Sequence, residues 1–490
     1  MPLFARRHAP ARTIELTILL ALLGAGGRVG HAQRPDAAAG ASSIRPLAYT
    51  RIALSNGLIA LVNEDHSSPL VVVDVWYHVG SKDDKPGRTG MAHLCEHLFN
   101  EGSPNLDQTE KAFYNSIGGT SPHYAATTED ITHFFIAVPS NELETVLWAE
   151  SDRMAAPFAR ADAKRLSGVR EVIGQERDRN VENFPFGVAR ELAVAELFPV
   201  GHPYHMTPLP PMADLYTATI DDLQTSCAPY YVPSNAVLSI SGDVDASVAR
   251  GLIQKYFGGI PRGAAIARPS AAPVALAGEK RVVLEDSRAN QPRLQIDWPV
   301  VGFSHPDRLA LRALASALSL NRFGRLSTLL INNRQLATTV SVDYYDFEKA
   351  GVFEILVIPR PGASMTTIEM LVDSVMASLP SSPLTARELE RFNNYNATTA
   401  VSSLETRFAR ADTLAHGQIF AGDPVAYAKQ VAAARALTAG DVQRAIARYL
   451  ATGRLVMSLV PAGKLDLISK PNLPFRNVTP PSSVRAKVTP

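Results

Sequence analysis

Residues 91–100 contain two histidines and a glutamate at the spacing of a metal site. The segment reads MAHLCEHLFN, so His93 and His97 stand four positions apart. On a helix, residues i and i+4 lie one turn apart on one face, and both imidazoles can reach the same metal ion. Glu96 shares that face, while the apolar residues of the segment lie opposite. The pattern therefore predicts a helix with one reactive face and one packing face.

The chemistry that suits this face is zinc-dependent hydrolysis. Catalytic zinc takes three protein ligands and keeps a fourth position for water, and two histidines are suitable ligands. Glu96 is too close in sequence to its histidines to be the third ligand, and we expect it to take a proton from the water as general base. The alternative is an ordinary helix in which His93 and His97 are solvated or satisfied within the core.

A second segment supplies a candidate for the missing ligand. Residues 162–182 place apolar side chains at helical spacing from Leu166 to Ile173, and Glu176 is the next position in this register. A carboxylate that continues an apolar stripe is buried and needs a cation. Glu176 is therefore preferred over Glu171, which falls off the stripe. An ion pair with a neighbouring arginine is the alternative role for Glu176.

Length and composition limit the number of domains and the kinds of partner. The chain has 490 residues, with 48 basic and 47 acidic side chains and a net charge of +1. Such a chain is long enough for about two to four domains, and its balanced charge argues against nucleic acid as a partner. Its two cysteines, Cys95 and Cys227, cannot build a disulfide framework. We expect both to be free thiols, Cys95 as a buried hydrophobic residue and Cys227 in the core or at an interface.

The chain also contains an internal repeat. The motif at residues 62–65 and the strand pattern that ends at Trp76 reappear at residues 283–286 and Trp298, with an offset of 222 residues at the tryptophans. Each copy continues into a helical pattern, and residues 400–416 form a further long helical candidate. Hairpin signals rather than regular βαβ alternation predict an α+β fold with two homologous domains, each a mostly antiparallel sheet with packed helices.

The N-terminus has the features of an export signal. Positive charge is followed by a short apolar stretch at residues 17–24 and by small residues up to Ala32. Because a membrane span needs roughly 20 apolar residues, we expect no stable membrane insertion. The expected location is the periplasm, or outside a cell that has none. The predicted segments are a signal peptide over 1–32, an N-terminal zinc-binding domain over 46–260, a linker over 261–279, a C-terminal domain over 280–468 and a Pro-rich extended tail over 469–490.

With these motifs the chain resembles the pitrilysin/insulinase-type zinc metallopeptidases, the inverzincins, whose motif is His-x-x-Glu-His. The likeness extends over most of residues 46–465. In that family the third ligand is a glutamate about seventy to eighty residues beyond the motif, and Glu176 lies 79 residues after His97. The resemblance implies that four such domains, from two chains, enclose a chamber in which extended peptides are cut.

The activity that the resemblance implies is that of a zinc-dependent endopeptidase acting on peptides or unfolded protein segments. Zinc would polarise the scissile carbonyl, and Glu96 would deprotonate the bound water. A non-catalytic scaffold or binding subunit of a peptidase-like heteromer is the alternative. A processing enzyme for one peptide precursor would differ only in the breadth of its substrates.

One departure from the family pattern concerns the partner. In catalytically active members of that family, a segment of the second half carries an arginine and, seven residues later, a tyrosine. These two side chains hold the substrate and the oxyanion. Residues 324–338 match this segment, but Ile331 and Thr338 occupy the two positions. Neither side chain supplies a cationic donor or a phenol hydroxyl to an oxyanion. We therefore expect a hetero-oligomer with a homologous subunit that lacks the zinc motif and contributes the pair.

Arg334 with Tyr344 or Tyr345 is an alternative within this chain for the missing pair, although its spacing differs from the family pattern. At residues 121–128, relatives often carry asparagine before an edge strand that pairs with substrate. His123 stands in this segment, and we interpret it as an ordinary loop histidine.

Overall fold

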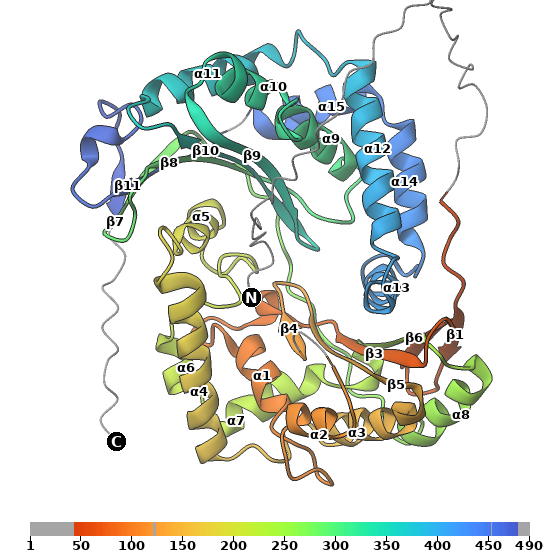
Figure 1. Ribbon diagram of the computed structural model, residues 1–490. Helices are drawn as coiled ribbons and strands as arrows, with labels where there is room; N and C mark the ends of the chain where they lie inside the picture. Colours follow the sequence, from red (N-terminus) through yellow and green to blue (C-terminus); the bar gives the residue numbers. More distant parts are fainter. Residues whose placement is uncertain (1–43, 121–123, 452, 479–490) are drawn as a thin grey trace, which may run out of the picture. The chain divides into compact units, whose positions relative to one another are not determined.

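Two six-stranded sheets organise this computed structural model, which describes residues 44–120, 124–451 and 453–478. The first sheet has the order β1-β2-β6-β3-β5-β4, and the second β12-β7-β11-β8-β10-β9 (Figure 1). The strands are β1 (Thr50–Ala53), β2 (Ile59–Glu64), β3 (Leu70–Tyr77), β4 (Ala125–Thr127), β5 (Thr132–Pro139), β6 (Ala236–Gly242), β7 (Lys280–Asp286), β8 (Arg293–Val301), β9 (Ala337–Asp346), β10 (Ala350–Pro359), β11 (Leu455–Pro461) and β12 (Arg476–Val478). The predicted signal segment and His123 lie outside the described residues.

The two sheets share one pairing pattern except at one edge, where β1 pairs with β2 antiparallel and β12 pairs with β7 in parallel. β2 pairs with β6, and β7 with β11, in parallel. The next strands, β3 and β5 in one sheet and β8 and β10 in the other, add antiparallel pairs. The strands β2 and β3 carry the first copy of the sequence repeat, and β7 and β8 carry the second. The predicted α+β fold with two similar halves is thus confirmed.

Helices cover one face of each sheet and form its main core. The first half contains α1 (Met91–Phe99), α2 (Glu110–Ser116), α3 (Leu143–Ala155), α4 (Ala163–Arg177), α5 (Ala189–Leu197), α6 (Ala213–Thr217), α7 (Ile220–Asp222) and α8 (Ala246–Phe257), with the π-helical turn η4 (Leu223–Cys227). The second half contains α9 (Arg308–Ser319), α10 (Arg325–Ser327), α11 (Met365–Ser378), α12 (Ala386–Ser402), α13 (Arg407–Ala421), α14 (Ala426–Ala436) and α15 (Ala439–Ala445), with the π-helical turn η7 (Thr328–Asn333). Among the described residues, no helix is both long and apolar enough to cross a bilayer.

The single helix predicted over residues 400–416 is wrong. α12 ends at Ser402 and α13 begins at Arg407. The side chain of Thr406 accepts a hydrogen bond from the backbone N–H of Ala409 and caps the new helix. Short polar side chains favour such caps over a continuous helix. The apolar periodicity of the sequence continues through Thr406 and therefore did not indicate the break.

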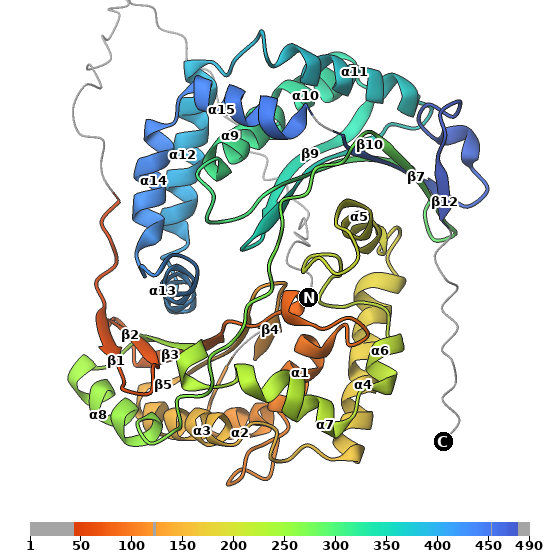
Figure 2. The ribbon, with the colours of Figure 1, turned by 180° about the vertical axis from the view of Figure 1, so that it is seen from behind.

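Each sheet is covered on its second face by a helix from the other half of the sequence. α5 of the first half packs Val194 and Leu197 against β8 and β11 of the second sheet. α13 of the second half packs Leu414 and Ala415 against β2, β3 and β6 of the first sheet, next to Trp76. Figure 2 shows both helices from behind. The two halves therefore complete each other's apolar surfaces.

A buried polar cluster lies beneath α13. His133 Nδ1 lies 3.1 Å from Asp74 Oδ1, and the indole of Trp76 donates to Asp74 Oδ2 at 2.9 Å. Asp412 of α13 brings a carboxylate to the same place, and the ligand-type atoms of the three acidic and histidine residues lie within 4.8 Å of one another. Burial, the largest single effect, lowers the pKa of His133, but the charge of Asp74, its hydrogen bond and the charge of Asp412 together raise the pKa overall. No pattern in the sequence indicates this contact between the halves.

The segment after β11 returns to the second sheet, where β12 pairs in parallel with β7. Before it, the hydroxyl of Ser469 donates to Glu369 Oε2 at 2.5 Å, and Lys470 Nζ lies 2.7 Å from Glu369 Oε1. Arg281 of β7 donates to both oxygens of this carboxylate. Residues 469–478 of the predicted tail thus pack on the second half.

Glu369→Ala is expected to lower the free energy of unfolding by about 3–5 kcal/mol, because it leaves buried cations without their partner. Burial raises the pKa of Glu369, but the hydrogen bonds from Arg281, Lys470 and Ser469 outweigh it and hold the pKa at about 2. The contribution is therefore complete above the ordinary pKa of 4.5 and is lost as the pH falls through about 2. Urea unfolding at neutral and acidic pH measures this difference.

Asp373→Ala provides the control on the same helix. The Asp373 side chain is 31% exposed and pairs with Arg454 and Lys470, so its loss should cost at most about 1 kcal/mol. Equal effects of the two substitutions at neutral pH, or a Glu369→Ala effect that persists undiminished at low pH, would contradict the assignment.

Candidate metal centre

Helix α1 carries the two histidines on one face and packs with the other. Leu94 and Leu98 are buried in the core of the first half, where apolar burial fixes the helix against the sheet. On the opposite face, His93 Nε2 and His97 Nε2 lie 3.2 Å apart. The division into a packing face and a reactive face follows the i, i+4 spacing of the sequence.

Glu176 of α4 completes a three-residue cluster with these histidines. Its Oε2 lies 3.4 Å from His93 Nε2 and 3.4 Å from His97 Nε2. Ile173, one turn earlier, is fully buried, whereas Glu171 is exposed. The structure therefore brings His93, His97 and Glu176 together and leaves Glu171 away from the cluster. The ion-pair contacts of Glu176 are with the two histidines rather than with an arginine.

The three atoms have the spacing of a zinc site. Zinc binds histidine nitrogen and carboxylate oxygen at about 2.0–2.2 Å, so two ligands of a tetrahedral ion stand about 3.3 Å apart. The separations of 3.2, 3.4 and 3.4 Å match this edge length. His93, His97 and Glu176 thus fit three corners of a tetrahedron and leave the fourth corner to a further ligand.

Burial and hydrogen bonding set the protonation of the cluster. Burial lowers the pKa of His93 to about 4, which keeps its imidazole neutral and able to bind a metal. Burial, the largest single effect, lowers the pKa of His97, but the hydrogen bond with Glu176 and the nearby carboxylate charges together raise the pKa overall. Burial, the largest single effect, raises the pKa of Glu176, but the hydrogen bond from His97 and the charges of the two histidines together lower the carboxyl pKa overall. Because a metal ligand must be deprotonated, a cation in this cluster would displace the proton from the His97 nitrogen that it binds.

Glu96 lies on the same helix with its carboxylate held by the edge strand. It is 7% exposed, and its Oε2 accepts a hydrogen bond of 2.5 Å from the hydroxyl of Thr127 in β4. Thr132 of β5 lies behind Thr127, with the two hydroxyl oxygens 3.3 Å apart, and donates to the carbonyl of Val79. Thr127 was not predicted from the sequence, because its contact with Glu96 arises from strand pairing and not from a motif.

Both ends of α1 are fixed by hydrogen bonds. At the N-terminal end, the half-buried carboxylate of Asp84 accepts from the N–H groups of Gly90 and Ala92, at 2.8 and 2.9 Å. Gly90 has a φ of 83°, a conformation that favours glycine. At the other end, Arg153 donates to the side chain of Asn100 at 3.0 Å. The first N–H groups of a helix have no partner within the helix, so Asp84 supports the helix that carries the ligands by accepting from them.

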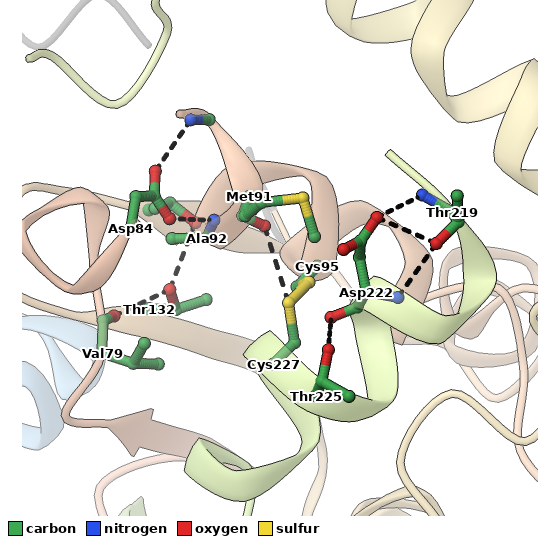
Figure 3. The surroundings of a disulfide bond; sticks show 12 residues. Val79, Asp84, Met91, Ala92, Cys95, Thr132, Thr219, Asp222, Thr225 and Cys227 are labelled. Carbon is green, nitrogen blue, oxygen red and sulfur yellow. Dashed lines mark hydrogen bonds between the residues drawn. A yellow bond between two sulfur atoms is a disulfide. The ribbon is translucent and has the colours of Figure 1, made fainter. Parts of the chain in front are cut away.

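The prediction of two free thiols is wrong, because Cys95 and Cys227 form a disulfide. Figure 3 shows the bond between α1 and the end of η4, with Met91 beside it. Cys95 does point away from the metal face, as predicted, but η4 packs on that side and brings Cys227 to it. The cysteines are 132 residues apart in sequence, and only the tertiary fold shows that they are neighbours.

The positions of the missing arginine and tyrosine lie in the second half. Ile331 of η7 packs against the second core, and Thr338 of β9 donates its hydroxyl to the carbonyl of Ile358 at 3.2 Å. In the internal alternative, the hydroxyl of Tyr344 donates to the carbonyl of Val301 at 2.7 Å. Tyr345 contacts Glu354 within the second sheet. These tyrosine hydroxyls are thus engaged in local structure.

Two family models match this chain. The model described as "Insulinase (Peptidase family M16)" matches residues 59–192, which include the metal cluster. The model described as "Peptidase M16 inactive domain" matches residues 217–394.

Curated relatives include the zinc protease PqqE of Helicobacter pylori, 26% identical over 364 residues, with 73% of this chain and 80% of the relative covered. The probable mitochondrial-processing peptidase subunit beta of Schizosaccharomyces pombe is 24% identical over 381 residues, covering 74% of this chain and 80% of the relative.

Solved structures share the fold. A protease from Helicobacter pylori matches with a TM-score of 0.76 and 23% identity, over 84% of this chain and 100% of that chain. The first half of the periplasmic protease PqqL from Escherichia coli matches with a TM-score of 0.69 and 15% identity, over 84% of this chain and 91% of that chain. Against whole PqqL, the match covers 47% of that chain, so one PqqL chain is about twice as long as the matched region.

Proposed function

Because the chain belongs to the insulinase family of peptidases, family M16, we propose that it is a zinc-dependent endopeptidase that cleaves peptides or unfolded protein segments. The observation that carries this proposal is the cluster of His93, His97 and Glu176, whose ligand atoms stand 3.2 to 3.4 Å apart. The position of Glu96 on the same helix supports hydrolysis over a purely structural metal.

The metal would be held by His93 Nε2, His97 Nε2 and Glu176 Oε2. A zinc ion in this position supplies Lewis acidity that polarises the scissile carbonyl. The neutral imidazole of His93 and the carboxylate of Glu176 are already in the protonation states that a cation needs. The fit of the three atoms to a tetrahedron is the reason for preferring zinc to a larger oxygen-binding cation.

Glu96 is the general base of the proposed reaction. Since Thr127 donates to its Oε2, we assign proton transfer to the other oxygen, Oε1. Glu96 takes a proton from the attacking water as the water oxygen bonds to the carbonyl carbon. It then delivers that proton to the amine nitrogen as the peptide C–N bond breaks. Thr127 holds the carboxylate in place through both steps.

The oxyanion formed in this reaction needs donors that the second half of this chain does not supply at the family positions. Ile331 has no donor, and the hydroxyl of Thr338 is bonded to its own sheet. We therefore propose a hetero-oligomer in which a homologous subunit without the zinc motif contributes the arginine and tyrosine. The family model described as an inactive domain supports subunits of unequal function.

A non-catalytic scaffold is the rival function. It has no use for two histidines and a glutamate at the spacing of metal ligands beside a buried carboxylate. Zinc content and cleavage of a quenched peptide library separate the two functions. A chain that binds no zinc and cleaves no peptide, alone or with a homologous partner, would be a scaffold.

Removal of the metal should abolish hydrolysis reversibly. We expect 1,10-phenanthroline to reduce peptide cleavage to background and a slight excess of zinc to restore it, because His93, His97 and Glu176 are the proposed ligands. Glu176→Gln removes one charged ligand and should lower zinc content in the same assay. Activity that survives complete loss of zinc would contradict the metal mechanism.

Export to the periplasm is a further proposal. The charged and apolar segments within residues 1–32 support it. The Cys95–Cys227 disulfide is also consistent with it, since disulfides persist in oxidising compartments. Fractionation of cells that express the full chain tests this location.

A further inference from the structure

The disulfide joins the metal-binding motif to a distant part of the first half. Cys95 lies two residues from His93 and two residues from His97. Its partner, Cys227, is the last residue of η4, 132 positions later. The covalent bond therefore acts on the same short helix that supplies two of the three proposed ligands.

Helix α1 depends on its attachments for its position. It has nine residues, which is too short for a stable isolated helix in water. Asp84 and Asn100 hold its two ends through hydrogen bonds. The disulfide adds a covalent attachment near the middle, where both sulfur atoms belong to buried residues, Cys95 at 0% and Cys227 at 3% exposure.

The attachment controls rotation of α1 about its own axis. Two residues correspond to a turn of about 200°, so Cys95 projects from the face opposite His93 and His97. Side-chain tips lie about 5–6 Å from a helix axis, and a rotation of 10° moves them by about 1 Å. Metal sites are built to about 0.2 Å. A rotation of α1 by only about 2° would therefore use up this tolerance.

The rotation of α1 affects the metal site because the third proposed ligand, Glu176, lies on a different helix. Glu176 belongs to α4, so the separations from its Oε2 to the two histidine nitrogens depend on how α1 is placed against α4. Figure 3 shows the bond on the η4 side of α1, where Cys227 Sγ also lies 3.9 Å from the carbonyl of Met91. The helix is thus held from the side that does not bind the metal.

We infer that Cys227, acting through its disulfide with Cys95, is a positioning residue of the metal centre. The bond fixes the rotation of α1, so that His93 and His97 keep the spacing to Glu176 that zinc needs. This inference rests on the proposed function and adds to it the requirement that the chain be oxidised before it binds zinc tightly.

The test measures metal binding by the full chain rather than catalysis. The oxidised chain is compared with Cys95→Ala/Cys227→Ala, using competition with a chromogenic chelator for zinc and visible absorption after loading with Co²⁺. We expect the zinc dissociation constant to rise by about 10- to 100-fold, the range seen when groups that orient metal ligands are removed. The tetrahedral Co²⁺ bands should weaken or shift.

Two further variants separate positioning from general stability. Cys227→Ala alone removes the bond and leaves Cys95 on α1, and it should lose affinity like the double variant. Ile368→Ala opens the core of the second half, where Ile368 is fully buried. It should lower the thermal midpoint and leave zinc affinity and the Co²⁺ spectrum unchanged.

The possible outcomes separate a failure of this inference from a failure of the proposed function on which it rests. Equal zinc affinity and identical Co²⁺ spectra with and without the disulfide overturn the inference and leave the proposed function standing. An equal loss of affinity in Ile368→Ala also overturns it, because the effect would then be one of stability. Failure of the oxidised chain to bind zinc overturns both.

Discussion

Glu96→Gln is expected to slow peptide hydrolysis by about 10²- to 10⁴-fold, the usual contribution of a general base, while the zinc content remains unchanged. The carboxamide has nearly the volume of the carboxylate but cannot accept the proton of the attacking water. Its oxygen can still accept the hydrogen bond that Thr127 donates to Glu96. The substitution therefore removes the chemistry and keeps the local geometry.

The measurement combines cleavage of quenched peptides with zinc determined on the same sample. Glu171→Gln is the matched control, since Glu171 is exposed on α4 and lies away from the ligand cluster; its activity should stay within about twofold, as expected for a surface change. Unchanged hydrolysis by Glu96→Gln with zinc retained would refute the assignment of Glu96 as base.

The second large effect concerns the partner subunit. We expect the chain alone to hydrolyse peptides about 10²- to 10³-fold more slowly than its complex with a homologous subunit that carries the arginine and tyrosine, because one oxyanion donor is worth about this factor. Ile331 supplies no donor to an oxyanion, and the hydroxyls of Thr338 and Tyr344 donate to carbonyl groups of their own sheet.

A homologue encoded beside this chain, exported and without the His-x-x-Glu-His motif, is the partner to purify with it. A partner variant with phenylalanine for its tyrosine tests the contribution of the hydroxyl and should lose most of the gain. Full peptidase activity from a homodimer of this chain would contradict the proposal of unequal subunits.

The fold was largely predictable where apolar periodicity and repetition were strong. The offset of 222 residues between Trp76 and Trp298 corresponds to equivalent strands, β3 and β8, in two sheets that share the pairing of all but one edge strand. The helix over residues 400–416 was not predictable in this way, because Thr406 starts a new helix through its side chain. Periodicity reports which residues are buried and is insensitive to a local cap.

In the candidate site, too, the residues with a regular spacing in the sequence were predicted and the others were not. His93, Glu96 and His97 are close in sequence, and Glu176 continues an apolar register, so helical geometry alone brought these residues into the prediction. Thr127 and Asp84 were not predicted as residues of the site. Thr127 reaches Glu96 because β4 pairs with β5, and Asp84 reaches the start of α1 through a loop.

The reactive motif, the register of the third carboxylate and the twofold repetition are all visible in the sequence, because each of them is a regular spacing along the chain. The disulfide between Cys95 and Cys227, the approach of Asp412 to Asp74 and His133, and the packing of α5 and α13 on the opposite sheets become visible only in the folded chain. These contacts join segments far apart in the chain, and their partners are set by how whole helices and sheets bury their remaining apolar faces, which no local pattern records.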